Sequence, residues 1–520
     1  MQRYKILWAD DEIDLLKPHI LFLNNKGYNV TPVNSGADAL DEIGKDNYDI
    51  VFLDENMPGM TGLETLSHIK TSNPNVPVVM ITKSEEEHIM EEAIGSKIAD
   101  YLIKPLNPNQ ILLSVKKLLD NKRLVSEKTN LSYQQDFRNI SMAFYDDMDY
   151  NEWVDVYKKL VYWELEIENT EDKSMSEILD NQKEEANKNF ASFIKSNYED
   201  WVTDPNVDHP VLSNQLMKKK VFPQLEEGIP VFFIVIDNLR YDQWEILEPT
   251  MADMFNMVED DFYYSILPTT TAYARNSIFS GMMPSEMEKR HPDLWVGDDK
   301  DEGKNNHEEE FLKRNLDKNR LNIKSSYHKI IHANHGKTLL DNTANLMKND
   351  LNVVVFNFVD MLSHARTDMQ MIRELAPDEA AYRSLTLSWF MHSPLLDFMK
   401  KISESNVKVI VTTDHGTIRV RRPFKIVGDR NTNTNLRYKH GKNLGYDGKD
   451  VFEVRRPETM QLPRQNVSTS FAIAQEDYFF AYPNNFNYYV NHYKDTFQHG
   501  GISMEEMILP VVTLRPKKYD

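Results

Sequence analysis

Short apolar runs that end in polar or charged residues alternate with amphipathic stretches over the first 120 residues, and this pattern constrains the fold most. The five runs are Lys5–Asp10, Asn29–Val33, Tyr48–Asp54, Pro77–Thr82 and Asp100–Lys104. Runs of this length separated by helical patterns are typical of βαβ units, which form a parallel sheet. Function in such sheets gathers at the carboxyl ends of the strands. We therefore expect a five-stranded parallel sheet with a site along one edge.

The residues at the ends of these runs share one chemistry. Asp10 and Asp11 end the first run, Asp54 the third, Thr82 the fourth and Lys104 the fifth. Three carboxylates at one edge repel one another unless a cation joins them, and oxygen ligands favour Mg²⁺. A lysine and a threonine hydroxyl beside them suit the oxygens of a phosphorylated aspartate. The alternative interpretation is a flavodoxin-like domain whose acids only cap helices.

These residues resemble the CheY-like receiver family, and the resemblance covers essentially residues 1–120. It implies that Asp54 accepts a phosphoryl group. It also implies a Mg²⁺ ion in the receiver, and the ligands would be Asp10, Asp11, Asp54 and the backbone carbonyl of Asn56.

The same resemblance implies a switch that reads the phosphoryl group. Thr82 and Lys104 would contact that group, and Tyr101 stands at the position of the switch aromatic. A receiver implies a sensor histidine kinase as partner and a homodimer that forms on phosphorylation.

The second half of the chain repeats the pattern of apolar runs that end in aspartate, now with histidines close behind. We expect three buried strands to deliver these side chains to one edge of a second sheet. The residues that gather in this way are Asp237, Asp360, His364, Asp414, His415 and His499. Buried carboxylates and imidazoles in one place call for a cation. Nitrogen and oxygen ligands without sulfur suit an open catalytic Zn²⁺ site, with Mn²⁺ as the alternative.

The composition excludes several classes of protein. Cysteine is absent, so disulfides and thiolate metal ligands are both ruled out. The formal net charge of −21 argues against binding duplex DNA over a broad surface. No apolar run approaches the roughly 18 residues of a membrane span, and acids stand where a secretory signal is apolar. We expect a cytoplasmic protein without membrane insertion.

A hydroxyl-rich segment lies between the runs that end at Asp237 and Asp360. Pro268 is followed by the three threonines Thr269–Thr271, and a helical pattern begins there. A hydroxyl at a helix N-terminus meets a dipole that suits anionic oxygens. The alternative is that these threonines are simple helix caps.

Together these motifs resemble the alkaline phosphatase superfamily, and within it the PglZ domain. The resemblance implies two Zn²⁺ ions in an effector domain that hydrolyses nucleotide or oligonucleotide phosphodiesters. One ion would be held by Asp360, His364 and His499. The other would be held by Asp237, Asp414, His415 and the hydroxyl of Thr271.

The resemblance also implies a threonine nucleophile. Thr271 matches the nucleophile position of the superfamily's nucleotide phosphodiesterases, and Thr270 is the alternative register. Arg275 and Asn276, one turn into the helix, would steady the non-bridging oxygens of the phosphoryl group.

A receiver joined to a PglZ domain resembles the PorX-type response regulators, which are associated with type IX secretion. The resemblance implies that phosphorylation at Asp54 controls a zinc-dependent phosphodiesterase. The alternative is a non-catalytic signalling adaptor that docks a sigma factor or a secretion-system component through its PglZ domain.

The stretch between the two halves is polar, with aromatic and aliphatic residues at helical spacing. We interpret it as a helical bundle linker. The predicted protein is α/β, with a flavodoxin-like receiver at residues 1–122, the linker at 123–210 and an alkaline-phosphatase-like α/β/α effector domain at 211–520. An insertion is expected near residues 285–345.

A basic run follows the Asp414–His415 pair. Eight lysines or arginines and a single acid lie between Thr417 and Lys442. In an acidic protein such a run is typical of either a solvated loop or a groove that follows a nucleic-acid backbone. The candidate substrate contacts are Arg419, Arg421, Arg422, Arg437 and Lys439.

Overall fold

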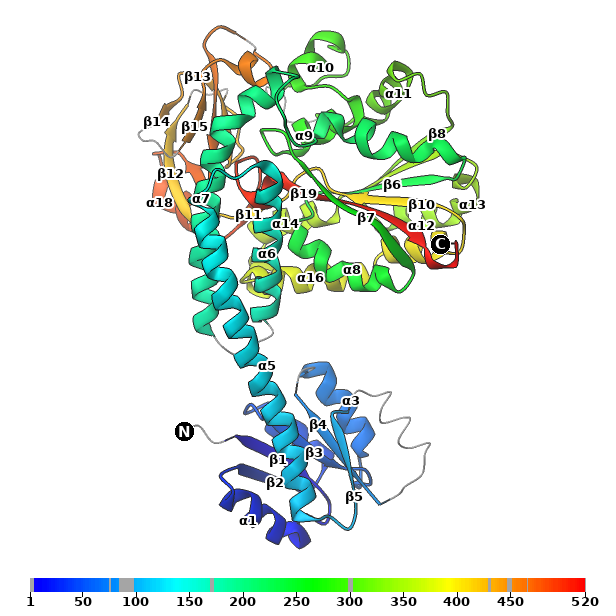
Figure 1. The fold of residues 1–520 in the computed structure, drawn as a ribbon, viewed down its shortest axis with the longest axis vertical. Helices are drawn as coiled ribbons and strands as arrows, with labels where there is room; N and C mark the ends of the chain where they lie inside the picture. The colour runs from blue at the N-terminus through cyan, green and yellow to red at the C-terminus, as the bar shows by residue number, and fades with distance from the viewer. Residues whose placement is uncertain are drawn as a thin grey trace. The chain divides into compact units, whose positions relative to one another are not determined.

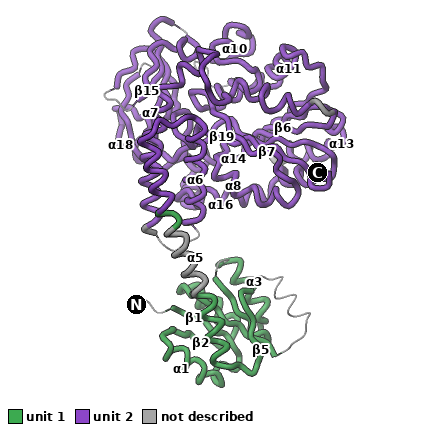
Figure 2. Tube along the Cα trace, in the orientation of Figure 1, with its two compact units in different colours: residues 1–134 green, residues 135–520 purple. Residues whose placement is uncertain are grey.

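The chain divides into two compact units in a computed structural model, Met1–Gln134 and Gln135–Asp520 (Figure 2). The boundary falls within one long helix, α5 (Pro108–Ala143). The structure describes residues 4–73, 76–83, 98–168, 173–297, 303–428, 432–446, 451–464 and 466–519.

The first unit contains a five-stranded parallel sheet with the order β2-β1-β3-β4-β5 (Figure 1). Its strands are β1 (Lys5–Ala9), β2 (Asn29–Val33), β3 (Ile50–Asp54), β4 (Val78–Thr82) and β5 (Asp100–Ile103). Every residue of β3 and β4 is buried, as expected for central strands covered on both faces. The predicted flavodoxin-like sheet is confirmed.

Two cores lie on opposite faces of this sheet because side chains alternate along each strand. The helices that the described part of this unit contains besides α5 are η1 (Ile13–Leu16), α1 (Lys17–Asn25), α2 (Gly36–Ile43) and α3 (Gly62–Ser72). Trp8 and Phe52 pack with Leu23 of α1 on one face. Leu7 and Leu53 belong to the cluster on the other face, which α2 and α3 complete.

Helices α6 (Tyr150–Glu168) and α7 (Lys173–Thr203) belong to the second unit, with the last turns of α5. Their contact is aromatic: the ring centroids of Trp153 and Phe190 lie 5.4 Å apart. The buried amide of Gln182 on α7 donates to the backbone oxygen of Phe137 on α5 at 2.9 Å. The spacing of apolar residues therefore correctly predicted a helical linker.

A six-stranded sheet with the order β7-β19-β10-β6-β9-β8 forms the centre of the second unit (Figure 1). Its strands are β6 (Val231–Ile236), β7 (Phe255–Tyr264), β8 (Ser325–Ile330), β9 (Leu351–Phe356), β10 (Lys408–Thr412) and β19 (Ile508–Pro516). Strands β8, β9, β6 and β10 are parallel, whereas β19 is antiparallel to both of its neighbours. The carboxyl ends of β6, β9 and β10 therefore meet at one edge.

Helices cover both faces of this sheet, which makes the α/β/α arrangement that the sequence predicts. They are α8 (Tyr241–Ala252), α9 (Thr271–Ser280), α10 (Pro284–Arg290), α11 (Glu308–Lys318), α12 (Ala333–Asp341), α13 (Thr343–Leu346), α14 (Phe358–Asp368), α15 (Gln370–Leu375), α16 (Glu379–Met391) and α17 (Pro394–Ser403). Figure 1 shows α9 and α11 on one side of the sheet and α8 and α16 on the other. Phe233 of β6 joins the core with Ile278 of α9 and Phe311 of α11. Phe232 points the opposite way, 5.6 Å from the ring of Phe398 on α17.

An insertion is expected near residues 285–345, and part of this segment packs into the layers around the central sheet. It supplies α11, whose Phe311 and Leu312 enter the main core, and the edge strand β8. Strand β8 pairs in parallel with β9 from Ser325 to Ile330. Most of its described part is therefore built into the sheet layers, and residues 298–302 lie outside the described residues.

Between β10 and β19 the chain forms three small sheets. The strands are β11 (Ile418–Arg419), β12 (Arg422–Val427), β13 (Tyr438–Lys442), β14 (Gly445–Tyr446), β15 (Val451–Val454), β16 (Thr469–Ala474), β17 (Tyr478–Ala481) and β18 (Phe497–Gln498). The short helices α18 (Phe486–Tyr493) and α19 (Met504–Met507) follow. Single turns of helix complete the unit at η2 (Ser213–Gln215), η3 (Met217–Val221), η4 (Phe222–Glu227), η5 (Pro457–Met460) and η6 (Lys517–Tyr519). Within the described ranges, none of the helices combines the length and apolar character that crossing a bilayer requires.

Candidate metal centre and phosphorylation site

Three carboxylates converge at the carboxyl edge of the receiver sheet. Asp10, Asp11 and Asp54 each offer an oxygen within 4.8 Å of the others. The Lys104 ammonium lies 2.7 Å from Asp54 Oδ1 and 2.9 Å from Asp10 Oδ2. Burial raises the pKa of Asp54, although Lys104 opposes that shift. The single positive charge of Lys104 does not neutralise three carboxylates, and a bound metal ion would supply further positive charge.

The other predicted receiver residues are Thr82, Tyr101 and Asn56. The Thr82 hydroxyl donates to the carboxylate of Glu55. Tyr101 is 40% exposed on β5, and Asn56 is exposed in the loop after β3. The structure therefore brings the acids and the lysine together and leaves Thr82 hydrogen-bonded to a neighbour.

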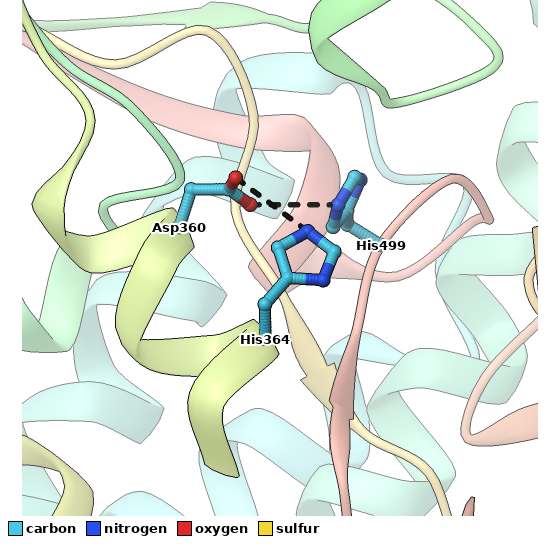
Figure 3. A group of neighbouring side chains, drawn as sticks. All are labelled: Asp360, His364 and His499. Atoms are coloured by element: carbon cyan, nitrogen blue, oxygen red, sulfur yellow. Dashed lines mark ion pairs between the residues drawn. The ribbon is translucent and has the colours of Figure 1, made fainter. Parts of the chain in front are cut away.

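Asp360, His364 and His499 form the first ligand group of the second unit (Figure 3). His364 Nε2 lies 3.5 Å from Asp360 Oδ2, and His499 Nε2 lies 3.7 Å from Asp360 Oδ1. The sequence suggested that Asp360 ends a strand, but β9 already ends at Phe356 and Asp360 lies in the first turn of α14. A spacing of four residues then puts Asp360 and His364 on one face of the helix.

Asp237, Asp414 and His415 form the second group, at the ends of the parallel neighbours β6 and β10. His415 Nε2 lies 3.8 Å from both Asp237 Oδ1 and Asp414 Oδ2. All three side chains are fully buried. The residue after His415 is Gly416. Only glycine fits there, because a Cβ atom would lie 1.9 Å from the backbone oxygen of Glu505.

The hydroxyl of Thr271 lies beside the second group, at the first residue of α9. Its Oγ1 is 3.0 Å from His415 Nε2 and 3.4 Å from Asp237 Oδ1. Thr270 stands at the N-cap position, yet its side chain makes no capping hydrogen bond and its Oγ1 is buried without a partner. Simple capping therefore does not account for this pair of threonines.

The imidazoles are oriented as neutral ligands. His415 Nδ1 lies 3.2 Å from the backbone oxygen of Gly416, and His499 Nδ1 lies 3.4 Å from that of Thr269. A carbonyl on Nδ1 favours a proton there and leaves the Nε2 lone pair free for a cation. Burial lowers the pKa of both rings, which stack with centroids 4.3 Å apart. The two ligand groups are therefore immediate neighbours.

The donor set fits cations on electrostatic grounds. Burial, and then the charge of Asp237, raise the pKa of Asp414 well above its usual value, and Asp414 Oδ2 is buried without a hydrogen bond. Burial and Asp237 likewise raise the pKa of Asp360 to about 6. Burial also opposes ionisation of Asp237, but Arg275 and His415 outweigh it and keep that pKa low. Positive charge between these carboxylates would offset the cost of their burial.

Arg275 and Asn276, predicted to contact phosphoryl oxygens, are engaged within the protein. The buried Arg275 guanidinium lies 2.6 Å from Asp237 Oδ2 and 2.6 Å from Glu308 Oε1. The Asn276 amide donates to the backbone oxygens of Ala272 and Lys304, each at 2.9 Å. Arg275 thus supports a ligand and Asn276 supports the loop beside Thr271.

Sequence reasoning missed Asn238, which links the two ligand groups. Its backbone N–H donates to Asp414 Oδ1 and its side-chain amide to Asp360 Oδ1, both at 3.3 Å. Asn238 has a φ of 68°, a conformation that asparagine tolerates better than most residues. An asparagine directly after a strand-ending aspartate was the available signal.

The first ligand group and Thr271 adjoin a cleft of about 440 Å³. Thr271, His364 and His499 lie in its wall, as do the rings of Tyr438 and Tyr493. The His364 side chain is 64% exposed, so the first group is open to small molecules.

The basic run does not present five free cations. Arg419 pairs with Asp495 at 3.1 Å, Arg421 with Glu184 at 3.3 Å, and Arg422 with Glu476 at 2.7 Å. Arg437 is buried against Glu506 at 2.7 Å. Arg430, another member of the run, lies outside the described residues. Each of the four described arginines therefore has an acidic partner within this unit.

Lys439 is 1% exposed and has a backbone partner in place of a carboxylate. Its Nζ donates to the backbone oxygen of Asn433 at 2.9 Å and lies 4.7 Å from the centre of the Tyr482 ring. Burial lowers its pKa to about 7. The folded protein therefore disfavours the charged form of Lys439.

We expect Lys439→Met to stabilise the protein most at pH 7 and below. The unfolded lysine titrates near 10.5 and the folded one near 7. The unfolded state therefore binds more protons between these values, and wild-type stability rises with pH there, by about 1.4 kcal/mol per unit. The gain from the substitution should shrink as the pH rises through this window. Thermal unfolding across it would show this, with the exposed Lys442→Met as control; a gain independent of pH would contradict the expectation.

The chain is similar to parts of several known regulators. It is 36% identical over 123 residues to the transcriptional regulatory protein ZraR of Klebsiella oxytoca, covering 24% of this chain and 28% of ZraR. It is 31% identical over 115 residues to ResD of Bacillus subtilis, covering 22% of this chain and 48% of ResD. The chain thus spans less than half the length of these curated relatives.

Solved receiver structures also match a part of the chain. Chemotaxis protein CheY4 of Vibrio cholerae has 27% identity and a TM-score of 0.22, covering 22% of this chain and 99% of CheY4. The receiver domain of the Francisella response regulator 1452 has 27% identity and a TM-score of 0.22, covering 23% of this chain and 98% of that domain.

Three family models match consecutive parts of the sequence. They are the response regulator receiver domain at residues 6–116, the PorX response regulator linker domain at 123–202, and the BREX system PglZ alkaline phosphatase-like domain at 216–514. The last of these spans more than half of the chain. The chain therefore belongs to the PglZ alkaline phosphatase-like family, with the receiver and linker of a PorX-type response regulator.

Proposed function

We propose that the PglZ domain is a zinc-dependent phosphodiesterase acting on nucleotides or oligonucleotides, and that phosphorylation of Asp54 controls it. The observation that carries this proposal is the position of Thr271. Its hydroxyl lies within 3.4 Å of two members of one ligand group, and it shares a cleft with His364 and His499 of the other. A hydroxyl between two groups of nitrogen and oxygen ligands suits attack on phosphorus.

Two Zn²⁺ ions would be held by the two ligand groups. Asp360, His364 and His499 would hold one, and Asp237, Asp414 and His415 the other. Such ions supply positive charge that lowers the pKa of a nearby hydroxyl and offsets charge on phosphoryl oxygens. Zinc is favoured because the set combines imidazole and carboxylate ligands and the chain has no cysteine.

Thr271 then acts as the nucleophile in an in-line displacement. As Oγ1 forms a bond to phosphorus, the bond to the leaving oxygen breaks, and the hydroxyl proton passes through water to that oxygen, which departs as an alcohol. Water then hydrolyses the resulting nucleotidyl-threonine ester, which releases a phosphate monoester and restores the hydroxyl. The Asn305 side-chain amide donates to the backbone oxygen of Thr271 at 3.0 Å and holds the nucleophile in place.

The receiver would be phosphorylated by a sensor histidine kinase and would bind Mg²⁺. Residues 1–122, 123–210 and 211–520 would be the receiver, linker and effector domains. The match to the PorX linker model supports a role in regulating type IX secretion.

Removal of metal is expected to abolish hydrolysis of bis(nitrophenyl) phosphate and short oligonucleotides. A chelator followed by dialysis should leave a folded, inactive protein, and Zn²⁺ should restore activity more fully than Mg²⁺. Metal analysis of the purified protein should give two zinc ions per chain outside the receiver. Hydrolysis that continues at full rate in metal-free protein would contradict the proposal.

Phosphorylation of Asp54 is expected to double the molecular mass. With Mg²⁺ and acetyl phosphate, light scattering should show a shift from monomer to dimer, and Asp54→Ala should abolish it. Asp14→Ala is a matched control, because Asp14 lies on η1 outside the group of three acids. An unchanged mass in the wild type would exclude a dimer switch.

A further inference from the structure

The short helix α19 lies directly behind both histidine-bearing loops of the metal centre. The N–H of Gly416, next to His415, donates to the backbone oxygen of Glu506 at 3.3 Å. The N–H of Gly501, two residues after His499, donates to Glu506 Oε1 at 2.8 Å. A shift of α19 would therefore displace the backbone next to one ligand and near the other.

Glu506 itself is held rigidly. Its carboxylate accepts from Arg437 Nη2 at 2.7 Å and from the Ser503 hydroxyl at 2.8 Å. Gly416 packs so tightly on α19 that no side chain fits between them. Helix α19 and the two histidine-bearing loops consequently form one tightly packed group, which moves together.

The buried side chain of Asn187, on helix α7 of the linker, is hydrogen-bonded to this packed group. Asn187 Oδ1 accepts from the backbone N–H of Met504 at 2.9 Å, and Asn187 Nδ2 donates to Glu505 Oε2 at 3.0 Å. The Met504 N–H is a first-turn donor that has no acceptor within its own helix. Asn187 is 4% exposed and Glu505 8% exposed, so water competes little for these bonds.

We infer that Asn187 is a positioning residue of the metal centre, through which the linker helix α7 sets the geometry of His415 and His499. This inference rests on the proposed function. The linker is then part of the scaffold that shapes the centre, and a displacement of α7 changes how well the histidines hold cations. Asn187 reaches them only through α19.

The test begins with Asn187→Leu, which keeps the volume and removes both hydrogen bonds. We expect zinc affinity and kcat for bis(nitrophenyl) phosphate to fall by about tenfold to a hundredfold, the usual effect of losing support behind metal ligands. KM should change little, because Asn187 is absent from the substrate cleft. Amide hydrogen exchange at Gly416 and Gly501 should accelerate even in metal-free protein.

Two substitutions, Asn187→Asp and Glu505→Gln, test whether the hydrogen bond between these side chains can be restored. Asn187→Asp alone places a carboxylate against Glu505 and should be impaired. Glu505→Gln alone should be near wild type, because its amide can turn an oxygen towards Asn187. The double variant keeps the bond from the Met504 N–H to an oxygen at position 187 and rebuilds the bond between positions 187 and 505 with donor and acceptor exchanged. It should therefore recover zinc affinity and kcat. A double variant as poor as Asn187→Asp would overturn the inference.

Gln182→Leu is the matched control, since Gln182 is a buried amide on the same helix that bonds to α5. It should lower thermal stability and leave zinc affinity unchanged. Equal losses of zinc affinity in Gln182→Leu and Asn187→Leu would overturn the inference, as would wild-type zinc affinity in folded Asn187→Leu. If the wild type neither binds zinc nor hydrolyses diesters, the proposed function fails and this inference fails with it. An active wild type with an unaffected Asn187→Leu sinks the inference alone.

Discussion

Thr271→Ala is expected to lower kcat for phosphodiester hydrolysis by at least about a thousandfold, since removing a nucleophile eliminates the chemical step. The Thr271 hydroxyl is the one oxygen in the threonine segment that lies within 3.4 Å of Asp237 and His415 among the described residues. Zinc content should stay close to that of the wild type, because six side chains remain to hold the two ions. Steady-state kinetics and metal analysis on the same preparation would measure both effects.

Thr270→Ala is the matched control for this experiment. The Thr270 hydroxyl is buried without a hydrogen bond, and its removal should reduce kcat far less. If Thr270→Ala is the inactive variant, the nucleophile is in the alternative register. If Thr271→Ala hydrolyses diesters at the wild-type rate, the proposed reaction is wrong.

Thr271→Ala also distinguishes between the two functional hypotheses, a catalytic enzyme and a non-catalytic signalling adaptor. A catalytic role predicts that signalling is lost in both Thr271→Ala and Asp54→Ala. A docking role predicts that Thr271→Ala still signals and only Asp54→Ala fails. Measuring the secretion response of both variants therefore discriminates between these hypotheses.

Arg275→Met is expected to destabilise the metal-free protein by about 3–5 kcal/mol, the usual cost of leaving buried charges without a partner. The Arg275 side chain is 1% exposed and joins Asp237 to Glu308. Its removal leaves Asp237 and Asp414 without their nearest cation, while Glu308 keeps Lys329 at 3.3 Å. Bound zinc should reduce this loss of unfolding free energy, because its positive charge would offset the negative charges of Asp237 and Asp414.

Urea unfolding with and without zinc would test this prediction. Arg314→Met is the control, since Arg314 pairs with the more exposed Asp293 and Glu310 and should matter little. Equal effects of the two substitutions would show that the buried pairs around Arg275 do not stabilise the fold. If zinc does not reduce the loss of unfolding free energy in Arg275→Met, then Arg275 does not contribute to the metal centre.

The fold and the ligand groups were predictable because they depend on local patterns. Apolar runs that end in Asp237 and Asp414 predicted buried strands of one sheet that end at the same edge, and the structure places β6 and β10 side by side in that sheet. The place of Asp360 was wrong by one element, since an apolar run does not show where a strand gives way to a helix. That boundary depends on backbone geometry at Asn357.

Contacts between distant segments could not be predicted. The basic run resembled a groove because its carboxylate partners are remote: Arg421 pairs with Glu184, and Arg437 with Glu506. Glu308 and Asn187 escaped notice for the same reason, since nothing near them in sequence points to the site. A single sequence carries no record of which distant residues pair.

The residues of the two ligand groups are spread from Asp237 to His499, and under the proposed zinc dependence this spread would tie the lifetime of the domain to the metal supply. No short segment of the unfolded chain contains a full ligand group, so cations bind the folded state far better. By mass action each tenfold rise in free zinc above the dissociation constant of a site then adds about 1.4 kcal/mol per occupied site to the free energy of unfolding. In a zinc-starved cell the domain would be more readily unfolded and degraded, and the amount of the protein would report on zinc availability.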